Sequence, residues 1–267
     1  MAPVIALLSD FGSQDHYAGT MRGVILSIAP GVTLVDITHD IPAHDVVSGA
    51  LQLAASFRYF PAGTIFLVVV DPGVGSGRRG IAAEAGGYRF VAPDNGVLTA
   101  VLREEPPRKM VELTERRYAR PTVSRTFEGR DRFAPAAAWL AKGIQLSALG
   151  RPVGNYQQID LPAAQVNDDV LMGEIVLVDR FGNLVSNIDR RTFEAFARSG
   201  PVQIVANDRP VARLVSTYSE MGAGELCALF GSSDHLELAL NAGHAGQQLG
   251  AGRGARVEIR RGAPEQA

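Results

Sequence analysis

The sequence predicts an α/β protein with two domains: a Rossmann-like, mainly parallel sheet with helices on both faces, and a smaller C-terminal β-barrel-like domain. Up to about residue 150, apolar strand patterns alternate with helical ones, which is typical of a parallel sheet covered on both sides. From residue 173 onward, short strands follow one another closely with turns between them, as in a small barrel or sandwich. The segment around Leu161 and Pro162 resembles a linker, so we place the domains at residues 1–160 and 161–267.

The N-terminal elements follow from local patterns. Strands are expected at 4–9, 32–37, 66–70, 80–85, 88–92 and 111–113, and helices at 17–28, 45–57, 94–103 and 133–142. The stretch from Phe66 to Val70 is apolar throughout, which indicates a strand buried on both faces. Asp71 ends this strand, and Pro72 and the glycines after it prevent its continuation. Asp45 is a candidate N-cap for the second helix.

The C-terminal elements are shorter and rest on alternation and turn residues. Strands are expected at 173–178, 183–187, 202–206, 211–214, 225–230, 235–238 and 255–260, and helices at 190–198 and 243–249. No internal repeat or low-complexity tract interrupts either half.

Charge and composition exclude several classes of function. Lys and Arg number 26 against 28 Asp and Glu, so the chain has no basic field for nucleic acid or a membrane surface. Cys227 is the only cysteine, which excludes an intrachain disulfide and a CxxC-type metal site. No apolar run reaches the length of a membrane span, and the N-terminus does not resemble a signal peptide. We therefore expect a cytoplasmic protein with no nucleic-acid or membrane partner.

Two aspartates follow predicted strands. Asp10 comes directly after 4–9 and Asp71 after 66–70, so both carboxylates face one crevice if these strands are neighbours in the sheet. Such a pair can bind a metal, hydrogen-bond sugar hydroxyls or position a water molecule. Capping of the next turn explains a single strand-end aspartate equally well, but two of them favour a site. Arg78 lies within reach of the same crevice.

Other polar residues are more ambiguous. Glu128 lies in a polar, glycine-containing segment before a helix, where Asp131 is explained as an N-cap. His39 and His44 stand beside aspartates, but their spacing matches no zinc template, so we expect no metal. The residues alone indicate a two-domain α/β enzyme or binding protein with an acidic crevice that also holds an arginine, and they do not name its substrate.

Seven collinear motifs resemble those of the S-adenosylmethionine hydroxide adenosyltransferase family, whose members are related to fluorinases and chlorinases. They are LLSDFG (7–12), DIPAHDVVSGA (40–50), FLVVVDPGVGSGRR (66–79), APDNGVLT (92–99), TFEGRDRFAP (126–135), VDRFGNLVSNI (178–188) and GSSDHLELALNAG (231–243). The resemblance implies a homotrimer in which S-adenosyl-L-methionine lies between the N-terminal domain of one subunit and the C-terminal domain of the next. It also implies attack of water or hydroxide on the ribose C5′ carbon, giving adenosine and L-methionine without a cofactor.

The resemblance also assigns residues. Asp71, Arg78 and Glu128 occupy the positions of the catalytic triad, in which the aspartate takes a proton or hydrogen bond from the water and the arginine orients the aspartate. The substrate-binding positions are Asp10 for the ribose hydroxyls, Asp15 and Asp179 for the methionine ammonium, Ser232 and Ser233 for its carboxylate, Asn183 for the adenine edge, Tyr218 for stacking on adenine, and the backbone at Leu240 and Ala242. Fluorinases have an arginine at the second serine position, which implies weaker binding of the carboxylate here.

Three departures from the fluorinases favour water over halide as the nucleophile. Asp71 stands where they carry a tyrosine, Gly129 stands where they carry the halide-binding serine, and the hairpin at Gly86-Gly87 lacks their extra loop.

A fourth departure concerns the triad, because its third member is a histidine in the family and Glu128 here. A glutamate can still pair with Arg78, but it adds a negative charge, so we expect activity with an altered rate and pH profile. Two alternatives stay open. One is a weak or inert protein that binds S-adenosylmethionine or adenosine, and the other is a metal-dependent hydrolase acting through Asp10, Asp71 and the histidines.

Overall fold

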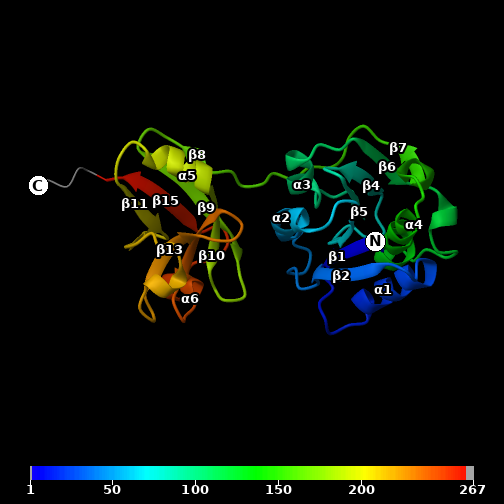
Figure 1. The fold of residues 1–267 in the computed structure, drawn as a ribbon, viewed down its shortest axis with the longest axis horizontal. Helices are drawn as coiled ribbons and strands as arrows, with labels where there is room; N and C mark the ends of the chain where they lie inside the picture. Colours follow the sequence, from blue (N-terminus) through cyan, green and yellow to red (C-terminus); the bar gives the residue numbers. More distant parts are fainter. Residues whose placement is uncertain (1, 263–267) are drawn as a thin grey trace, which may run out of the picture. The chain divides into compact units, whose positions relative to one another are not determined.

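The computed structural model describes residues 2–262 and divides into two compact units, Met1–Leu161 and Pro162–Ala267 (Figure 1). The first unit combines a mixed sheet with helices, and the second is an antiparallel, nearly closed sheet with two short helices. The predicted fold class is therefore confirmed. Among the helices of residues 2–262, none combines the length and the apolar composition that crossing a membrane requires.

The sheet of the first unit has the strand order β2-β1-β3-β5-β4-β6-β7. The pairs β1–β2, β1–β3 and β3–β5 are parallel, and the pairs involving β4, β6 and β7 are antiparallel. The strands are β1 (Val4–Ser9), β2 (Thr33–Thr38), β3 (Ile65–Val69), β4 (Gly80–Ala85), β5 (Tyr88–Pro93), β6 (Lys109–Leu113) and β7 (Gly150–Pro152). The short edge strand β7 was not predicted.

Helices cover both faces of this sheet, as expected. They are α1 (Tyr17–Ile28), α2 (Val46–Ser56), α3 (Thr99–Glu104) and α4 (Ala134–Ala141). Alternate residues of β3 enter two separate cores: Leu67 packs with residues of α1 and α4, whereas Phe66 and Val68 pack with residues of α2 and α3. This double burial explains why the strand is apolar throughout.

Two helix starts differ from the prediction. Helix α3 begins only at Thr99, because the side chains before it bind other segments: Asn95 Nδ2 donates to the Val70 carbonyl at 2.8 Å, and Asp94 Oδ1 accepts from Gln157 N at 2.7 Å. Asp131 is not an N-cap. It lies inside a π-helical turn, Gly129–Phe133, that precedes α4, and its buried carboxylate binds Arg130 and Ser124 N.

The second unit has the strand order β12-β11-β15-β9-β10-β14-β13, with β8 pairing to β9, and these pairings are antiparallel. A bridge between Leu214 and Ala228 joins the segment after β12 to β13, so the two ends of the sheet approach each other. The elements are β8 (Gln165–Val166), β9 (Val170–Val178), β10 (Leu184–Asp189), α5 (Arg190–Ala197), β11 (Val202–Ala206), β12 (Arg209–Val211), β13 (Leu226–Phe230), β14 (His235–Leu240), α6 (Ala245–Leu249) and β15 (Arg256–Arg261). The strand expected at 211–214 is thus displaced to β12.

Candidate functional site

The carboxyl ends of two neighbouring parallel strands carry the strand-end aspartates. Strand β1 pairs with β3 in a register that sets Ser9 opposite Val69, and Asp10 and Asp71 follow these strands closely in the chain. The side chain of Asp10 accepts a hydrogen bond from His44 N at 2.9 Å, which ties it to the loop before α2. The strands that precede Asp10 and Asp71 are therefore neighbours in the sheet, which is the condition for both carboxylates to face one crevice.

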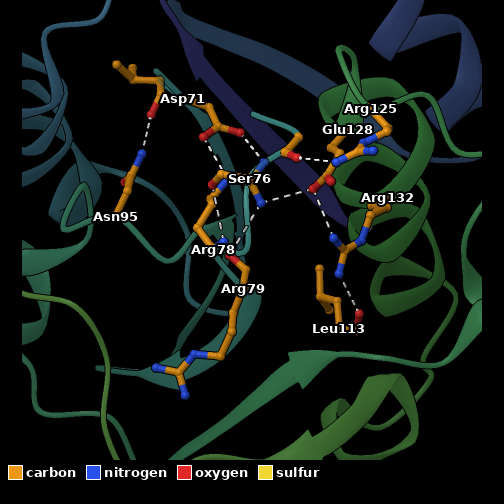
Figure 2. A network of polar contacts seen from close by, with 11 residues as sticks. Asp71, Ser76, Arg78, Arg79, Asn95, Leu113, Arg125, Glu128 and Arg132 are labelled. Carbon is orange, nitrogen blue, oxygen red and sulfur yellow. Dashed lines mark hydrogen bonds and ion pairs between the residues drawn. The ribbon is translucent and has the colours of Figure 1, made fainter. Parts of the chain in front are cut away.

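A buried ionic cluster occupies this edge of the sheet (Figure 2). The guanidinium of Arg78 binds Asp71 through two donors, Nε to Oδ1 at 2.7 Å and Nη2 to Oδ2, and donates through Nη1 to Glu128 Oε2 at 2.9 Å. The side chains of Asp71, Arg78 and Glu128 are only 6 %, 9 % and 10 % exposed. The structure thus brings the three predicted catalytic residues together, with one cation between two carboxylates.

Two loops hold the cluster, and they fit closely against each other. Gly75 has a φ of 78°, and a Cβ at this position would lie 2.3 Å from the carbonyl oxygen of Arg125, so a glycine is required. In return, Arg125 Nη2 donates to the Gly75 carbonyl at 3.2 Å. The loop carrying Asp71 and Arg78 is thereby fixed against the segment that leads to Glu128.

Arg132 also belongs to the cluster, although sequence reasoning missed it. Its Nη1 donates to the same Glu128 Oε2 at 2.9 Å, and its Nη2 donates to the Leu113 carbonyl at the end of β6 at 2.8 Å (Figure 2). The spacing of four residues between Glu128 and Arg132 was the available signal, because it places the two side chains on one helix face.

Burial and charge shift the acid–base properties of the cluster. Burial raises the pKa of the Asp71 carboxyl above its usual value; the pairing with Arg78 opposes this shift and the negative charge of Glu128 adds to it. Burial lowers the pKa of the Arg78 guanidinium, but Asp71 and Glu128 together outweigh burial and raise it, so Arg78 remains a cation. A carboxylate of increased basicity beside a fixed cation can accept a proton from a water molecule and stabilise the hydroxide that develops.

The second unit contains a cavity of about 940 Å³ between its turns. Six of the seven residues predicted there line it: Asp179, Asn183, Tyr218, Ser232, Leu240 and Ala242. Asp179 closes a tight turn, since its Oδ1 accepts from Asn183 N at 2.9 Å and its Oδ2 accepts from Asn183 Nδ2 at 2.9 Å. The cavity therefore combines a carboxylate, an amide and an aromatic ring within one unit.

Glu237 and Phe181 line the same cavity and were not predicted. Tyr218 Oη donates to Glu237 Oε1 at 2.7 Å; burial raises the pKa of the Glu237 carboxyl, and burial together with Glu237 raises the pKa of Tyr218. The alternation in β14 was a usable signal for Glu237, because Leu236 and Leu238 point into the core and the residue between them points away. With Asp179 and Glu237 in its wall, the cavity suits a cationic ligand.

Several predicted residues lie outside these two groups. Asp15 is exposed in the segment between β1 and α1, and Ser233 uses its carbonyl to accept from His235 Nδ1 at 2.8 Å. Both ring nitrogens of His39 are engaged, Nδ1 with Ser9 Oγ at 2.7 Å and Nε2 with Asp36 Oδ1 at 3.1 Å. Within residues 2–262, no group of three or more His, Cys, Asp and Glu side chains is arranged to hold a metal ion.

Comparison with known proteins agrees with this geometry. Residues 5–150 match the S-adenosylmethionine hydroxide adenosyltransferase N-terminal domain, and residues 173–258 match the C-terminal domain of the same family. The chain belongs to the S-adenosylmethionine hydroxide adenosyltransferase family. The resemblance drawn from the seven motifs is confirmed.

Curated members of the adenosyltransferase family are similar over nearly the whole chain. The (R)-S-adenosyl-L-methionine hydrolase of Thermus thermophilus is 37% identical, covering 97% of this chain and 100% of the relative. A fluorinase of Actinoplanes is 30% identical, covering 90% and 91%. A solved structure of an uncharacterized conserved protein from Thermotoga maritima has a TM-score of 0.90 at 35% identity, covering 96% of this chain and 100% of that one.

Family membership alone does not choose between water and halide, since relatives of both kinds match. The surroundings of Gly129 bear on this choice. A Cβ added there would lie 3.2 Å from Met21 Sδ and 3.3 Å from Val69 Cγ1, so a larger residue, such as the serine that the resemblance implies for fluorinases at this position, would require these side chains to shift.

Proposed function

We propose that this protein hydrolyses S-adenosyl-L-methionine to adenosine and L-methionine. A water oxygen attacks the ribose C5′ carbon, the C5′–O bond forms as the C5′–S bond breaks, and methionine leaves with the electron pair on its neutral sulfur. The proton of the water passes to Asp71 and then to solvent. The observation that carries the proposal is the buried cluster of Asp71, Arg78 and Glu128, together with hydrolase relatives that align along nearly the whole chain.

The reaction requires little of the protein beyond placing the attacking water in line with the C5′–S bond and excluding bulk solvent. The sulfonium is already a good leaving group, so the proposal requires no cofactor and no metal. Asp71 accepts the proton, Arg78 holds Asp71 and stabilises negative charge on the attacking oxygen, and Glu128 holds Arg78 from its other side. Asp10, at the end of the neighbouring strand, is proposed to bind the two ribose hydroxyls.

The cavity of the second unit is proposed to receive the rest of the substrate. Its carboxylates, Asp179 and Glu237, would attract the methionine ammonium and the sulfonium, with Asp15 as a second ammonium ligand. Tyr218 would stack on adenine, Asn183 and the backbone at Leu240 and Ala242 would bind its edge, and Ser232 and Ser233 would bind the methionine carboxylate. We further propose the (R) configuration at sulfur, because the names of the hydrolase relatives specify it.

Hydrolysis in isotopically labelled water tests this function directly. Incubation with the (R)-sulfonium diastereomer is expected to yield adenosine with one labelled oxygen at the 5′ position, measured by mass spectrometry, and EDTA should leave the rate unchanged. The (S) diastereomer is the matched control and should react far more slowly. A thermal shift with substrate but no adenosine would instead identify a binding protein, and loss of activity with EDTA would identify a metal-dependent hydrolase.

We also propose that the protein assembles as a homotrimer whose active sites combine the first unit of one subunit with the second unit of the next. Mixing Asp71→Asn and Asp179→Asn variants during refolding tests this arrangement, because each variant retains one intact half-site. Random assembly pairs two intact halves in about one interface in four, so the mixture should recover about a quarter of the wild-type rate. No recovery, with light scattering showing a trimer, would mean that each chain builds its own site.

A further inference from the structure

The ionic cluster continues beyond the three catalytic residues as a chain of alternating charges. Asp71, Arg78, Glu128 and Arg132 follow one another through hydrogen bonds, and Glu128 Oε2 accepts from both arginines at 2.9 Å (Figure 2). On the basis of the proposed hydrolysis, we propose that Arg132 is a positioning residue: it neutralises Glu128 and thereby keeps Arg78 aligned on Asp71.

Charge balance is the first argument. With Asp71 and Glu128 ionised, Arg78 alone leaves one excess negative charge among side chains that are at most 10 % exposed. An uncompensated buried charge is strongly unfavourable, and Arg132 removes it. Without Arg132, the two carboxylates would compete for one guanidinium, and Arg78 would be drawn away from the two-donor contact with Asp71 towards Glu128.

The anchoring of Arg132 is the second argument. Its side chain is 22 % exposed, and its second terminal nitrogen is fixed to the Leu113 carbonyl at 2.8 Å. An arginine serving only as a solvated counter-ion would not need this second contact. Because Leu113 ends β6 and Glu128 precedes the π-helical turn, Arg132 fixes the carboxylate relative to the sheet.

The other charged groups nearby are engaged elsewhere. On the π-helical turn, Arg130 binds Asp131 at 2.6 Å, and in the segment just before this turn Arg125 binds the Gly75 carbonyl. Glu115 lines a small cavity of about 20 Å³ together with Arg132 and pairs with Arg117 at 3.9 Å. Arg132 is therefore the second cation, after Arg78, that binds Glu128. Its removal should increase the effect of the Glu128 charge on the pKa of Asp71.

A double-mutant cycle over Glu128→Gln and Arg132→Met tests the proposal. In the wild-type background, Arg132→Met should lower kcat about tenfold with KM within about twofold, and should move the acid limb of the kcat–pH profile to higher pH, because the charge of Glu128 then raises the pKa of Asp71 further. In the Glu128→Gln background, the same substitution should change kcat less than about twofold. Arg132→Lys should restore most of the activity. Arg151→Met removes a surface arginine that pairs with Glu112, and serves as the matched control with no effect.

Equal losses in both backgrounds, or an acid limb that does not move, would overturn the positioning role and leave Arg132 as a structural residue only. Failure of the hydrolysis itself is distinguishable, because the wild type would then release no adenosine. In that case the melting temperatures of the four proteins of the cycle decide the inference: Arg132→Met should destabilise the wild type clearly more than it destabilises the Glu128→Gln variant, in which only the contact with the Leu113 carbonyl is lost. Equal destabilisation of both would refute it.

Discussion

Replacement of Asp71 by asparagine is expected to lower kcat for adenosine release by roughly a hundredfold to ten-thousandfold, the usual contribution of a positioned proton acceptor. Asparagine keeps the size of the side chain and one acceptor oxygen for Arg78, but it cannot take a proton from the water. KM should change little, because Asp71 acts on the nucleophile. The measurement is single-turnover release of adenosine, and a residual rate within about tenfold of the wild type would exclude Asp71 as the base.

The pH dependence of the same pair of proteins adds a second measurement. Because Asp71 acts as a carboxylate and its pKa is raised, the wild-type rate should fall on the acid side at a pH above 3.8, the unperturbed value for aspartate, and this limb should vanish in Asp71→Asn. The folded state binds the Asp71 proton more tightly than the unfolded state. The contribution of Asp71 to the free energy of unfolding therefore falls as pH rises from 3.8 through the raised pKa. Asp71→Asn should accordingly fold at neutral pH without a large loss of stability.

The second large effect is expected for Arg78→Met, which should abolish hydrolysis and destabilise the fold together. Removal of the central cation leaves Asp71 and Glu128 buried with only Arg132 as a partner, and breaking a buried ionic contact costs about 3–5 kcal/mol. For a unit of this size, the melting temperature should fall by about 10 °C. The loss should shrink as pH decreases, since protonation of either carboxylate relieves the uncompensated charge.

Arg78→Lys provides the control for this prediction. A lysine retains the charge but presents one compact ammonium, which cannot make two parallel contacts to Asp71 and a third to Glu128. We expect most of the stability to return while the rate remains low. If Arg78→Met were as stable as the wild type at neutral pH, this would contradict the view that Arg78 compensates the buried charges of Asp71 and Glu128.

Elements with strong local signals were predictable from the sequence. The apolar run from Phe66 to Val70 and the alternation of strands and helices identified the sheet, and Asp45 caps α2 by accepting from Ser48 N at 2.9 Å, as predicted. The failures lie where tertiary contacts override local patterns. Asp94 and Asn95 open no helix because distant backbone groups bind them, and Asp131 is drawn into a buried ion pair.

The candidate site shows the same division. Motifs placed Asp71, Arg78 and Glu128 in one cluster, because each stands in a recognisable local sequence. Arg132 and Glu237 lie within two of the same motifs, TFEGRDRFAP and GSSDHLELALNAG, but the motifs assign them no role, because their importance depends on which side chains they meet after folding. Apart from His235, the other residues of the strand that contains Glu237 are leucines and one alanine, so the position of Glu237 in the cavity wall follows from the pleat and the closure of the sheet rather than from composition.

The close fit between Gly75 and the Arg125 carbonyl has a consequence for how this scaffold can change. An insertion or a bulkier residue at Gly75, in the loop that carries Asp71 and Arg78, displaces the segment that presents Glu128. These two segments of the site therefore cannot change independently of each other. Laboratory evolution towards a different nucleophile should therefore randomise residues 71–79 and 124–128 jointly. Libraries confined to either loop should return mostly unfolded or inactive variants.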